Sequence, residues 1–392
     1  FIEYNRQDCA LLDRLDKKLK FLDLANTLAH ENTVLLQTTM GAVAVTEQAI
    51  INEAHERGMV VPNRKERYSD EDTQAAGAYV AYPRKGVHEY VGSIDINSLY
   101  PSAIRALNMG PETIVGQLRP VMTDRYIADK MRSGSSFAAA WEGLFGSLEY
   151  EAVMAMEKGT EITIDWADGE ESVHSAAEVW HLIFDSNQPW MLSANGTIFT
   201  YEREAVIPGL LKRWYAERKE MQAKLKEAKT NEDEEYWDKR QLVKKINLNS
   251  LYGAILNPGC RFFDKRIGQS TTLTGRSIAK HMDAYLNECI TGEYDHVGKS
   301  VIYGDTDSCY FSAWPAIKSE VEEGRMEWSK EICIALYDSL ADQVNASFPG
   351  FMEQAFHCPR DMGELIKCGR ETVADRGLFI TKKRYAVNAI DI

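Results

Sequence analysis

The stretch VIYGDTDSCYFS, residues 301–312, places two aspartates, Asp305 and Asp307, one residue apart between two apolar runs. Gly304, Asp305, Thr306 and Asp307 are typical turn residues, so the stretch predicts a tight β-hairpin. A turn alone does not need two carboxylates. Two unit charges about 4 Å apart repel by about 4 kcal/mol at an effective dielectric of about 20. Either a shared proton or a bound metal cation would relieve this repulsion.

Length and composition set the broad class of the protein. The 392 residues suffice for two or more domains, and 44% apolar with 27% charged residues is ordinary for a globular protein. No apolar run reaches the length of a membrane span, and no secretory signal opens the sequence. Seven scattered cysteines without a C-x-x-C pair predict reduced thiols in a cytosolic compartment. The histidines form no H-x-H or H-E-x-x-H pattern, which disfavours a zinc site.

The net charge of −14 argues against a nucleic-acid partner, but the charge is unevenly distributed. Residues 201–285 contain 17 Lys and Arg against 12 Asp and Glu, a net charge of +5, so the remainder carries −19. The chain therefore has a basic segment inside an acidic sequence.

Two long helices joined by a polar loop are predicted within that basic segment. Pro208 precedes LLKRWYAERKEMQAKLKEAK, the acidic loop TNEDEE follows, and a second helix is expected over about 234–256. Such a pair forms an antiparallel helical hairpin. Apolar periodicity predicts further helices over residues 10–30, 269–290 and 318–348.

Several strands are predicted in the remaining sequence. HEYVGSIDINSLYPS (88–102) begins as a strand and turns helical after Pro101, which suits the first helical position. EITIDWADGEESVHS predicts a hairpin around Asp168 and Gly169 with a helix from Ser175, and SANGTIFT (193–200) predicts an Asn-Gly hairpin. Residues 58–86 have the composition of a linker or an irregular wall.

Three groups of residues suggest chemistry. Asp95 ends an apolar strand, where a single aspartate is more often a turn or cap residue. Lys245, Asn249 and Tyr252 share one helical face, which by itself is better explained as a solvated face. Gly253 follows them, although glycine costs a helix about 1 kcal/mol. The third group is the Asp305 and Asp307 pair.

Taken together, these groups suit phosphoryl transfer. Asp95, Asp305 and Asp307 could form a carboxylate cluster for a hard cation such as Mg²⁺. Lys245, Asn249 and Arg218, on the basic helical hairpin, could bind a polyphosphate opposite that cluster.

The order of the motifs SIDINSLYPS, KKINLNSLYGA and YGDTDS resembles family B (Pol-α-like) DNA polymerases, most closely the replicative enzymes of T-even-like tailed phages. The similarity begins at Tyr4 and Asp8, which resemble the last motif of the family's 3′–5′ exonuclease. It ends at TKKRYAVN (381–388), which resembles the family's primer-contacting segment. Residues 118–192 match poorly.

The resemblance implies a role for each matching position. Asp95, Asp305 and Asp307 are the expected catalytic residues. Asp95 and Asp307 resemble the metal-bridging pair, the backbone carbonyl of Ile96 is a further ligand, and Asp305 resembles the neighbouring carboxylate. The implied cofactor is a pair of Mg²⁺ ions, for which Mn²⁺ can substitute. The resemblance further implies triphosphate contacts for Ser98, Leu99, Arg218, Lys245 and Asn249, and a contact with the sugar for Tyr100. Tyr252 and Gly253 would contact the new base pair, and Lys383, Arg384 and Tyr385 would contact the primer strand. Glu371 would lie near the metal centre.

The sequence also departs from the family pattern. Gln222 stands where the family often has Lys, and Lys219 or Lys224 could compensate. The chain opens at Phe1, after the first two acidic exonuclease motifs, so we expect that Asp8 cannot support editing alone. The thumb that we expect after the primer-contacting segment in the family is also missing, and the sequence does not decide between a split gene product and a fragment.

The resemblance implies an α+β fold: a right-hand palm, with an antiparallel sheet backed by helices, and an inserted helical-hairpin fingers domain. The expected parts are 1–30 as the end of an exonuclease-like domain, 31–61 as a connecting segment, 62–200 and 258–392 as palm, with 118–192 divergent, and 201–257 as fingers.

The predicted function is template-directed DNA polymerisation by two-metal nucleotidyl transfer. The expected partners are primer–template DNA and deoxynucleoside triphosphates, with a thumb-bearing second chain and a sliding clamp as further candidates and no membrane. A phage-encoded enzyme would act in the host cytoplasm. The alternative is a non-catalytic half of a split polymerase that binds nucleotide or DNA and needs a separate thumb-bearing chain. Tyr100 could equally be a core residue that packs the joint between strand and helix.

Overall fold

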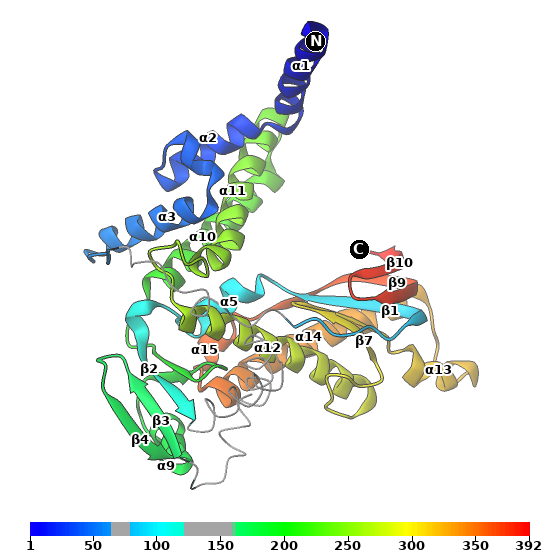
Figure 1. Cartoon of the computed structure of the whole chain (residues 1–392). Helices are drawn as coiled ribbons and strands as arrows, with labels where there is room; N and C mark the ends of the chain where they lie inside the picture. The colour runs from blue at the N-terminus through cyan, green and yellow to red at the C-terminus, as the bar shows by residue number, and fades with distance from the viewer. Residues whose placement is uncertain (64–78, 121–158, 160) are drawn as a thin grey trace. The chain divides into compact units, whose positions relative to one another are not determined.

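A computed structural model describes residues 1–63, 79–120, 159 and 161–392. These residues belong to two units (Figure 1). The helical unit comprises Phe1–Thr73 and Val206–Lys265, and the sheet unit comprises Gln74–Ala205 and Arg266–Ile392. Among the helices of the described residues, none is both long enough and apolar enough to cross a membrane. The palm and fingers assignments stay predictions.

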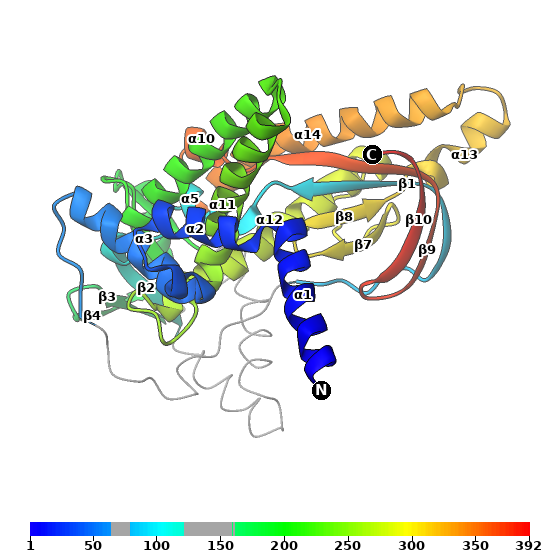
Figure 2. The same ribbon diagram turned by 90° about the horizontal axis from the view of Figure 1, so that it is seen from above.

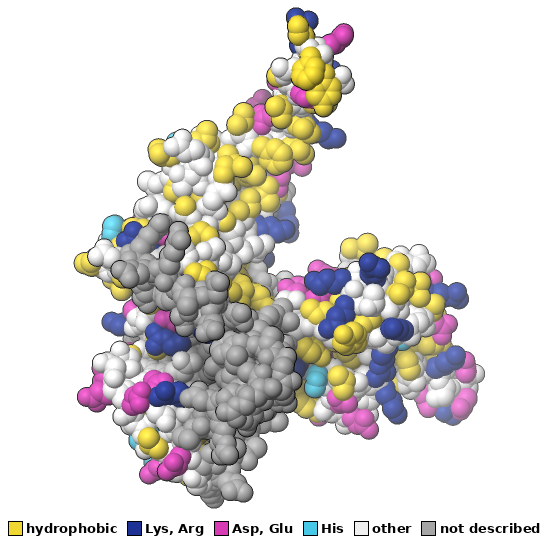
Figure 3. All heavy atoms as spheres, in the orientation of Figure 1, with side chains coloured by type: hydrophobic (Ala, Val, Ile, Leu, Met, Phe, Trp, Pro, Cys, Tyr) yellow, Lys and Arg dark blue, Asp and Glu magenta, His cyan; other side chains and the backbone are white. Residues whose placement is uncertain are grey.

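The helical unit contains α1 (Ile2–Leu19), α2 (Phe21–Asn32), the 3₁₀ helix η1 (Leu36–Met40), α3 (Ala42–Glu56), α10 (Val206–Glu227) and α11 (Asn231–Ile255). The single helix predicted over 10–30 is therefore wrong, because the chain breaks at Lys20. Lys20 adopts a left-handed backbone with φ of 56°, and Asp16 accepts hydrogen bonds from the Lys20 and Leu22 amides at 2.6 and 3.0 Å. No residue of α1 is buried, and apolar side chains are exposed along it (Figure 3).

The predicted helical hairpin is confirmed as α10 and α11, but the loop between the two helices is shorter than predicted. TNEDEE is not a loop, because Thr230 caps α11 by accepting a hydrogen bond from the Asp233 amide at 3.1 Å. Glu232, Asp233 and Glu234 then lie in the first turn, where negative charge interacts favourably with the helix dipole. Pro208 is the third residue of α10, still within the turn where its missing N–H is not needed.

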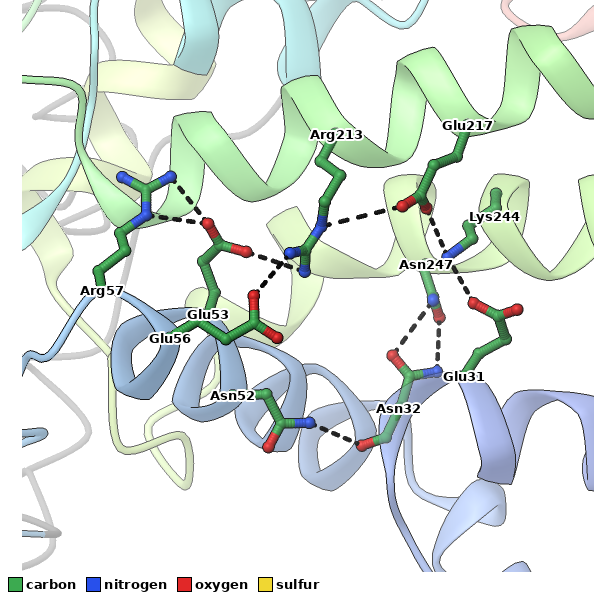
Figure 4. Close-up of polar contacts among 10 residues, drawn as sticks. All are labelled: Glu31, Asn32, Asn52, Glu53, Glu56, Arg57, Arg213, Glu217, Lys244 and Asn247. Atoms are coloured by element: carbon green, nitrogen blue, oxygen red, sulfur yellow. Dashed lines mark hydrogen bonds and ion pairs between the residues drawn. The ribbon is translucent and has the colours of Figure 1, made fainter.

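A buried polar network joins α2 to the helical hairpin (Figure 4). The Lys244 side chain of α11 is only 6% exposed, and its Nζ contacts Glu31 of α2 at 2.5 Å and Glu217 of α10 at 2.7 Å. Beside it, the amides of Asn32 and Asn247 exchange hydrogen bonds of 3.4 and 3.2 Å. Each of these polar groups has a partner, so the network can be buried and also fixes how the helices meet.

The same network continues to α3 through Glu53, whose side chain is 8% exposed. Arg57 and Arg213 each approach Glu53 at 2.8 Å, and Arg213 also contacts Glu56 at 3.0 Å. The carboxylates and cations therefore alternate across the helix interfaces, which compensates for removing the charges from water.

The sheet unit contains two five-stranded antiparallel sheets. The first has the strand order β10-β9-β1-β8-β7, and the second has the order β4-β3-β2-β6-β5. The first sheet consists of β1 (Gly86–Ile96), β7 (Val301–Asp305), β8 (Ser308–Phe311), β9 (Cys368–Thr381) and β10 (Arg384–Asp391), arranged as in Figure 2.

Helices cover one face of the first sheet (Figure 1). Gly92 of β1 shows how closely they approach, because a Cβ atom at Gly92 would lie 2.5 Å from the Tyr337 ring of α14. The helices of this part are α5 (Leu99–Ala106), the short 3₁₀ helix η2 (Pro111–Thr113), α12 (Lys265–Thr291), α13 (Trp314–Glu322), α14 (Lys330–Phe356) and α15 (Arg360–Gly363). The mixed α and antiparallel β architecture predicted from the sequence is confirmed.

The second sheet consists of β2 (Ile114–Pro120), β3 (Glu161–Trp166), β4 (Glu171–Ser175), β5 (Trp190–Leu192) and β6 (Thr197–Thr200). Both predicted hairpins are confirmed, and Ser175 caps α9 (Ala176–Trp180), which continues into a π-helical turn, η3 (His181–Asp185). Val179 and Ile183 pack on the buried Ile162, Ile164 and Ile198 side chains. Residues 121–158 of the divergent segment lie outside the described residues.

His281 of α12 is a buried titratable group that should make stability depend on pH. Its Nε2 lies 2.9 Å from Ser347 Oγ and its Nδ1 lies 2.8 Å from the Tyr294 hydroxyl, while the ring stacks on Phe351 at 4.1 Å. Burial lowers the pKa of His281 to about 4. The unfolded chain, with a histidine pKa of about 6.5, therefore takes up a proton first as the pH falls, so stability is lost between about pH 6.5 and pH 4.

We predict that His281→Gln removes this dependence while other groups continue to titrate. Between about pH 7 and pH 5, the wild-type free energy of unfolding should fall by about 2 kcal/mol more than that of the variant. Urea unfolding of both proteins at the two pH values measures the difference. Equal pH dependence in the two proteins would show that the folded chain binds a proton at His281 as readily as the unfolded chain.

We also predict that Lys244→Met destabilises the helical unit, because it leaves the Glu31 and Glu217 carboxylates together without their shared cation. The expected loss is about 1–3 kcal/mol, below the full cost of breaking a buried pair because both carboxylates are partly exposed. The control is Lys239→Met on the same helix, since Lys239 pairs at 3.0 Å with the exposed Asp23. It should cost less than about 1 kcal/mol in the same urea experiment. Equal losses of unfolding free energy in the two variants would show that the buried network adds no more stability than an exposed ion pair.

Candidate active site

The hairpin predicted from residues 301–312 is confirmed as β7 and β8, with Thr306 and Asp307 as its two-residue loop. Thr306 has φ of 61°, which is unfavourable for a β-branched residue. The Thr306 amide donates to the Tyr79 carbonyl at 2.8 Å, and the Asp307 amide donates to the Asp305 carbonyl at 2.7 Å. These contacts hold the turn in a conformation that costs of order 1–3 kcal/mol, which is more often found at functional sites.

The end of β1 lies beside this turn. Asp95 is paired with Ser308, and the amide of the next residue, Ile96, donates to the Asp307 carbonyl at 2.8 Å. Asp95 and Asp307 are both half-buried, whereas Ile96 is fully buried. The fold thus brings together two aspartates that are more than two hundred positions apart in the sequence.

Both carboxyl groups hold their protons more tightly than usual. Burial, together with the charges of Asp307 and Glu371, raises the pKa of Asp95 to about 7. Burial likewise raises the pKa of Asp307, with Asp305 and Glu371 adding to the effect. Glu371 is the extra residue of a bulge in β9, because Ser93 pairs with Thr372 while Ile94 pairs with Arg370. A bulge redirects a side chain, which explains how Glu371 acts on both aspartates.

Asp305 has different partners. Its carboxylate accepts hydrogen bonds from the Tyr303 hydroxyl at 3.0 Å and from the Thr306 hydroxyl at 3.2 Å, and Lys383 Nζ lies 3.4 Å away. The Lys383 amide also donates to the Tyr303 hydroxyl at 3.0 Å. Asp305 therefore links β7 to the turn between β9 and β10, rather than joining Asp95 and Asp307 as an equal member of one cluster.

The two coupled aspartates suit a hard cation in chemistry, although the ligand set is small. Among the described residues, no three His, Cys, Asp or Glu side chains gather closely enough to hold a metal ion. The raised pKa values of Asp95 and Asp307 show that negative charge is disfavoured there, and a divalent cation favours the charged form. Carboxylate oxygens together with a backbone carbonyl such as that of Ile96 are the donors that Mg²⁺ prefers.

Helix α5 begins directly after β1 and carries Ser98, Leu99 and Tyr100 at its start. Ser98 has a left-handed backbone with φ of 50°. The helix begins two residues earlier than predicted, because Pro101 is compatible with any position in the first turn. Tyr100 is half-buried, and its ring lies against Gly275 of α12, where a Cβ atom would be 2.9 Å from Cε1.

The primer-contacting segment predicted from the sequence forms the turn and start of β10. Lys383, Arg384 and Tyr385 are all exposed, and Lys383 has a left-handed backbone with φ of 59°. The Tyr385 ring stacks on Phe379 at 5.4 Å, and its hydroxyl accepts from that of Tyr310 at 3.0 Å. These contacts fix Tyr385 on the sheet while leaving 40% of it exposed.

The predicted nucleotide-binding residues of the helical hairpin belong to the helical unit. On α11, Lys245, Asn249 and Gly253 are exposed and Tyr252 is half-buried, while Lys244, Asn247, Leu248 and Leu251 are buried on other sides of the helix. On α10, the Arg218 Nε donates to Gln241 of α11 at 3.4 Å. Lys245, Asn249 and Gly253 therefore share one accessible face of α11, and the ligand of this face stays a prediction. Tyr4 and Asp8 are exposed on α1.

Sequence reasoning missed three supporting residues. Tyr303 positions Asp305, but it was indistinguishable from any apolar strand residue. Gly275 admits the Tyr100 ring, and a glycine inside a predicted helix was its only signal. The buried Asp283 of α12 lies under the hairpin, and its Oδ2 is 3.0 Å from the position of a Cβ at Gly304. Gly304 is therefore needed for close packing as well as for the turn.

The sheet thus brings two half-buried aspartates together at the ends of adjacent antiparallel strands. Residues 33–322 match DNA polymerase family B. The chain therefore belongs to this family.

Individual relatives are distant. The chain is 25% identical over 409 residues to the DNA-directed DNA polymerase of Escherichia phage RB69 and 26% identical over 427 residues to that of Enterobacteria phage T4. Both alignments cover 100% of this chain and 44% of the phage protein. A DNA polymerase of Pyrococcus glycovorans is 25% identical over 346 residues, covering 88% of this chain and 32% of that protein. The chain thus spans less than half the length of these relatives.

Proposed function

We propose that this chain carries the nucleotidyl-transfer site of a template-directed DNA polymerase. The primer 3′-oxygen attacks the α-phosphate of a deoxynucleoside triphosphate and pyrophosphate leaves. The observation that supports this most strongly is the coupling of Asp95 and Asp307 by the Ile96 amide at the turn of β7 and β8. Membership of DNA polymerase family B supports the same reaction.

In this proposal Asp95, Asp307 and the Ile96 carbonyl would hold two Mg²⁺ ions. Bound divalent cations would activate the attacking oxygen and stabilise the leaving phosphate oxygens. The protein itself places the backbone that carries the carboxylates, since Asp95 pairs with Ser308 and both the amide and the carbonyl of Asp307 are hydrogen-bonded. Asp305 acts as a positioning residue, because its carboxylate contacts Tyr303, Thr306 and Lys383.

The remaining site residues bind and orient the substrates. Exposed Lys245 and Asn249 of α11, with Arg218 of α10, are proposed to bind the triphosphate, together with the backbone N–H groups of Ser98 and Leu99. Phosphoryl transfer depends mostly on such positioning and charge stabilisation. Tyr252 and Gly253 would contact the new base pair.

Three residues of the turn and start of β10 are proposed to hold the primer strand. Lys383 and Arg384 provide exposed positive charge, and Tyr385 provides a ring fixed by Phe379 and Tyr310. Phosphate contacts of this kind position nucleic acid without reading its sequence.

Primer extension tests the proposal directly. Asp95→Asn and Asp307→Asn should each lower kcat by a thousandfold or more, because each removes several kcal/mol of transition-state stabilisation. The thermal midpoint of each variant should equal or exceed that of the wild type, since an amide removes the like-charge repulsion. Primer–template affinity should largely survive.

The matched control is Asp375→Asn on β9, where the Asp375 carboxylate accepts a hydrogen bond from exposed Asn388 at 2.8 Å. It should extend primers normally. Near-native turnover by either site variant would refute the two-metal assignment. If the wild-type chain extends primers only together with a separate thumb-bearing chain, the alternative of a non-catalytic half is correct.

Tyr100 is proposed to exclude ribonucleotides, because its ring is wedged against Gly275 and cannot retreat from a 2′-hydroxyl. Overpacking a rigid site costs about 1–3 kcal/mol, so the wild type should prefer deoxynucleotides by about 5- to 150-fold through this contact. We expect Tyr100→Ala to lower the ratio of kcat/KM for deoxynucleotides to kcat/KM for ribonucleotides by that factor. Tyr100→Phe should keep the wild-type ratio. An unchanged ratio in Tyr100→Ala would return Tyr100 to a core role.

A further inference from the structure

Asn195 is a buried amide in the loop between β5 and β6, residues 193–196, and it contacts α12. Its Nδ2 donates to the Arg266 carbonyl at 3.1 Å, and its Oδ1 accepts from the Ser270 hydroxyl at 2.7 Å. One turn further along α12, the Thr274 hydroxyl accepts a hydrogen bond from the Ala194 amide at 3.3 Å. The loop therefore contacts α12 at three positions spaced four residues apart, which lie on one face of the helix.

The second sheet holds this loop in place. The Gly196 carbonyl accepts a hydrogen bond from the Leu118 amide of β2 at 2.8 Å, and the Ser193 amide donates to the Thr197 carbonyl at 2.9 Å. Gly196 has φ of 82°, which favours glycine, and a Cβ atom there would lie 3.2 Å from Leu118. Helix α12 is thus hydrogen-bonded to backbone that has little freedom to move.

Gly275 lies on the other side of α12. Because successive helical residues are about 100° apart, Gly275 is about 140° away from the middle of the face that contacts the loop. The Tyr100 ring packs at Gly275, where a Cβ atom would be 2.9 Å from Cε1. A movement of α12 toward the loop would open space behind the ring, and the hydrogen bonds of Asn195 oppose that movement.

The polar character of this contact suits precise positioning. Its buried polar side chains are each no more than 2% exposed, namely Ser193, Asn195, Ser270 and Thr274. Burying such groups is costly unless they are hydrogen-bonded, and here the Ser193 and Ser270 hydroxyl oxygens also lie 3.0 Å apart. Directional hydrogen bonds fix one register between two surfaces, as a single buried asparagine does in a coiled coil.

We propose that Asn195 is a positioning residue for sugar selection. Together with Ser270, it holds α12 so that the Tyr100 ring stays in the path of a 2′-hydroxyl. This inference rests on the proposed function, which assigns the sugar contact to Tyr100. Asn195 contacts no substrate in this arrangement and acts only through α12.

Primer extension with deoxynucleotides and with ribonucleotides tests this role. Asn195→Ala should lower the ratio of kcat/KM for deoxynucleotides to kcat/KM for ribonucleotides by at least about threefold. The decrease should not exceed the about 5- to 150-fold that the whole Tyr100 contact supplies. A purely structural role would lower kcat/KM for both sugars alike and leave the ratio unchanged.

Two further variants show whether Asn195 acts through Tyr100. In a Tyr100→Ala background, Asn195→Ala should change the ratio by less than about twofold, because residues that act through one contact are not additive. Ser270→Ala removes a single hydroxyl from the same contact and should lower the ratio in the same direction. It keeps the test available if Asn195→Ala does not fold.

Matched controls lie on the same helix. Asn287 is also buried, and its side chain donates to the Glu293 carbonyl at 2.7 Å and accepts from the Ser300 amide at 3.1 Å. The Ser277 hydroxyl donates to the Leu273 carbonyl of its own helix at 3.1 Å. Asn287→Ala and Ser277→Ala should keep the wild-type ratio even where they lower stability.

A second measurement, urea unfolding, does not depend on activity. Gly275→Ala places a Cβ atom against the Tyr100 ring, and α12 can move away from the ring only where the loop no longer holds it. Gly275→Ala should therefore raise the unfolding equilibrium constant at least about threefold less in the Asn195→Ala background than in the wild type. In the Asn287→Ala background its effect should equal that in the wild type.

The proposal is overturned if Asn195→Ala and Ser270→Ala keep the wild-type ratio, or if Asn195→Ala lowers the ratio equally in the Tyr100→Ala background. If the wild-type chain extends no primer, alone or with a thumb-bearing chain, the proposed reaction is refuted and urea unfolding decides the role of Asn195. Additive effects of Asn195→Ala and Gly275→Ala on unfolding would then refute the positioning role as well.

Discussion

The hydrogen bond from the Ile96 amide to the Asp307 carbonyl is the contact on which the candidate active site depends. It places the end of β1 against the turn of β7 and β8, and so forces Asp95 and Asp307 into one half-buried place. The resulting repulsion and desolvation raise the pKa of both groups. A fold that only needed a turn would gain stability by avoiding this arrangement, and this is the physical argument behind the cation proposed for the site.

The surroundings of the aspartates resist relaxation. Thr306 is held in a left-handed backbone, Gly304 packs directly over the buried Asp283, and the Tyr303 hydroxyl connects Asp305 to the turn of β9 and β10. Rigid support of this kind keeps catalytic groups in position, because misplacement by even a small distance is costly in rate. The strained turn is stabilised by its neighbours rather than by its own sequence.

The helical unit uses charge differently. Lys244 and Glu53 are buried, but each is paired on more than one side, so their charges connect helices instead of repelling one another. The next residue along α11 from Lys244 is the exposed Lys245. Consecutive lysines therefore serve opposite purposes, one fixing the helix and the other remaining accessible to solvent, because successive helical residues point about 100° apart.

The sequence by itself determined the local elements and the kind of chemistry. The turn residues 304–307 specify the hairpin of β7 and β8. The Ser175 cap specifies the start of α9, and the Asn-Gly turn specifies the hairpin of β5 and β6, because these signals act within a few residues. The motif order also indicated the family. The break at Lys20, the helical start of α11 at TNEDEE and the bulge at Glu371 were decided by hydrogen bonds or pairing that periodicity does not reveal. The family resemblance already set Asp305 apart from Asp95 and Asp307, but only the tertiary structure showed its partners, Tyr303 and Lys383, because these contacts cross the sheet.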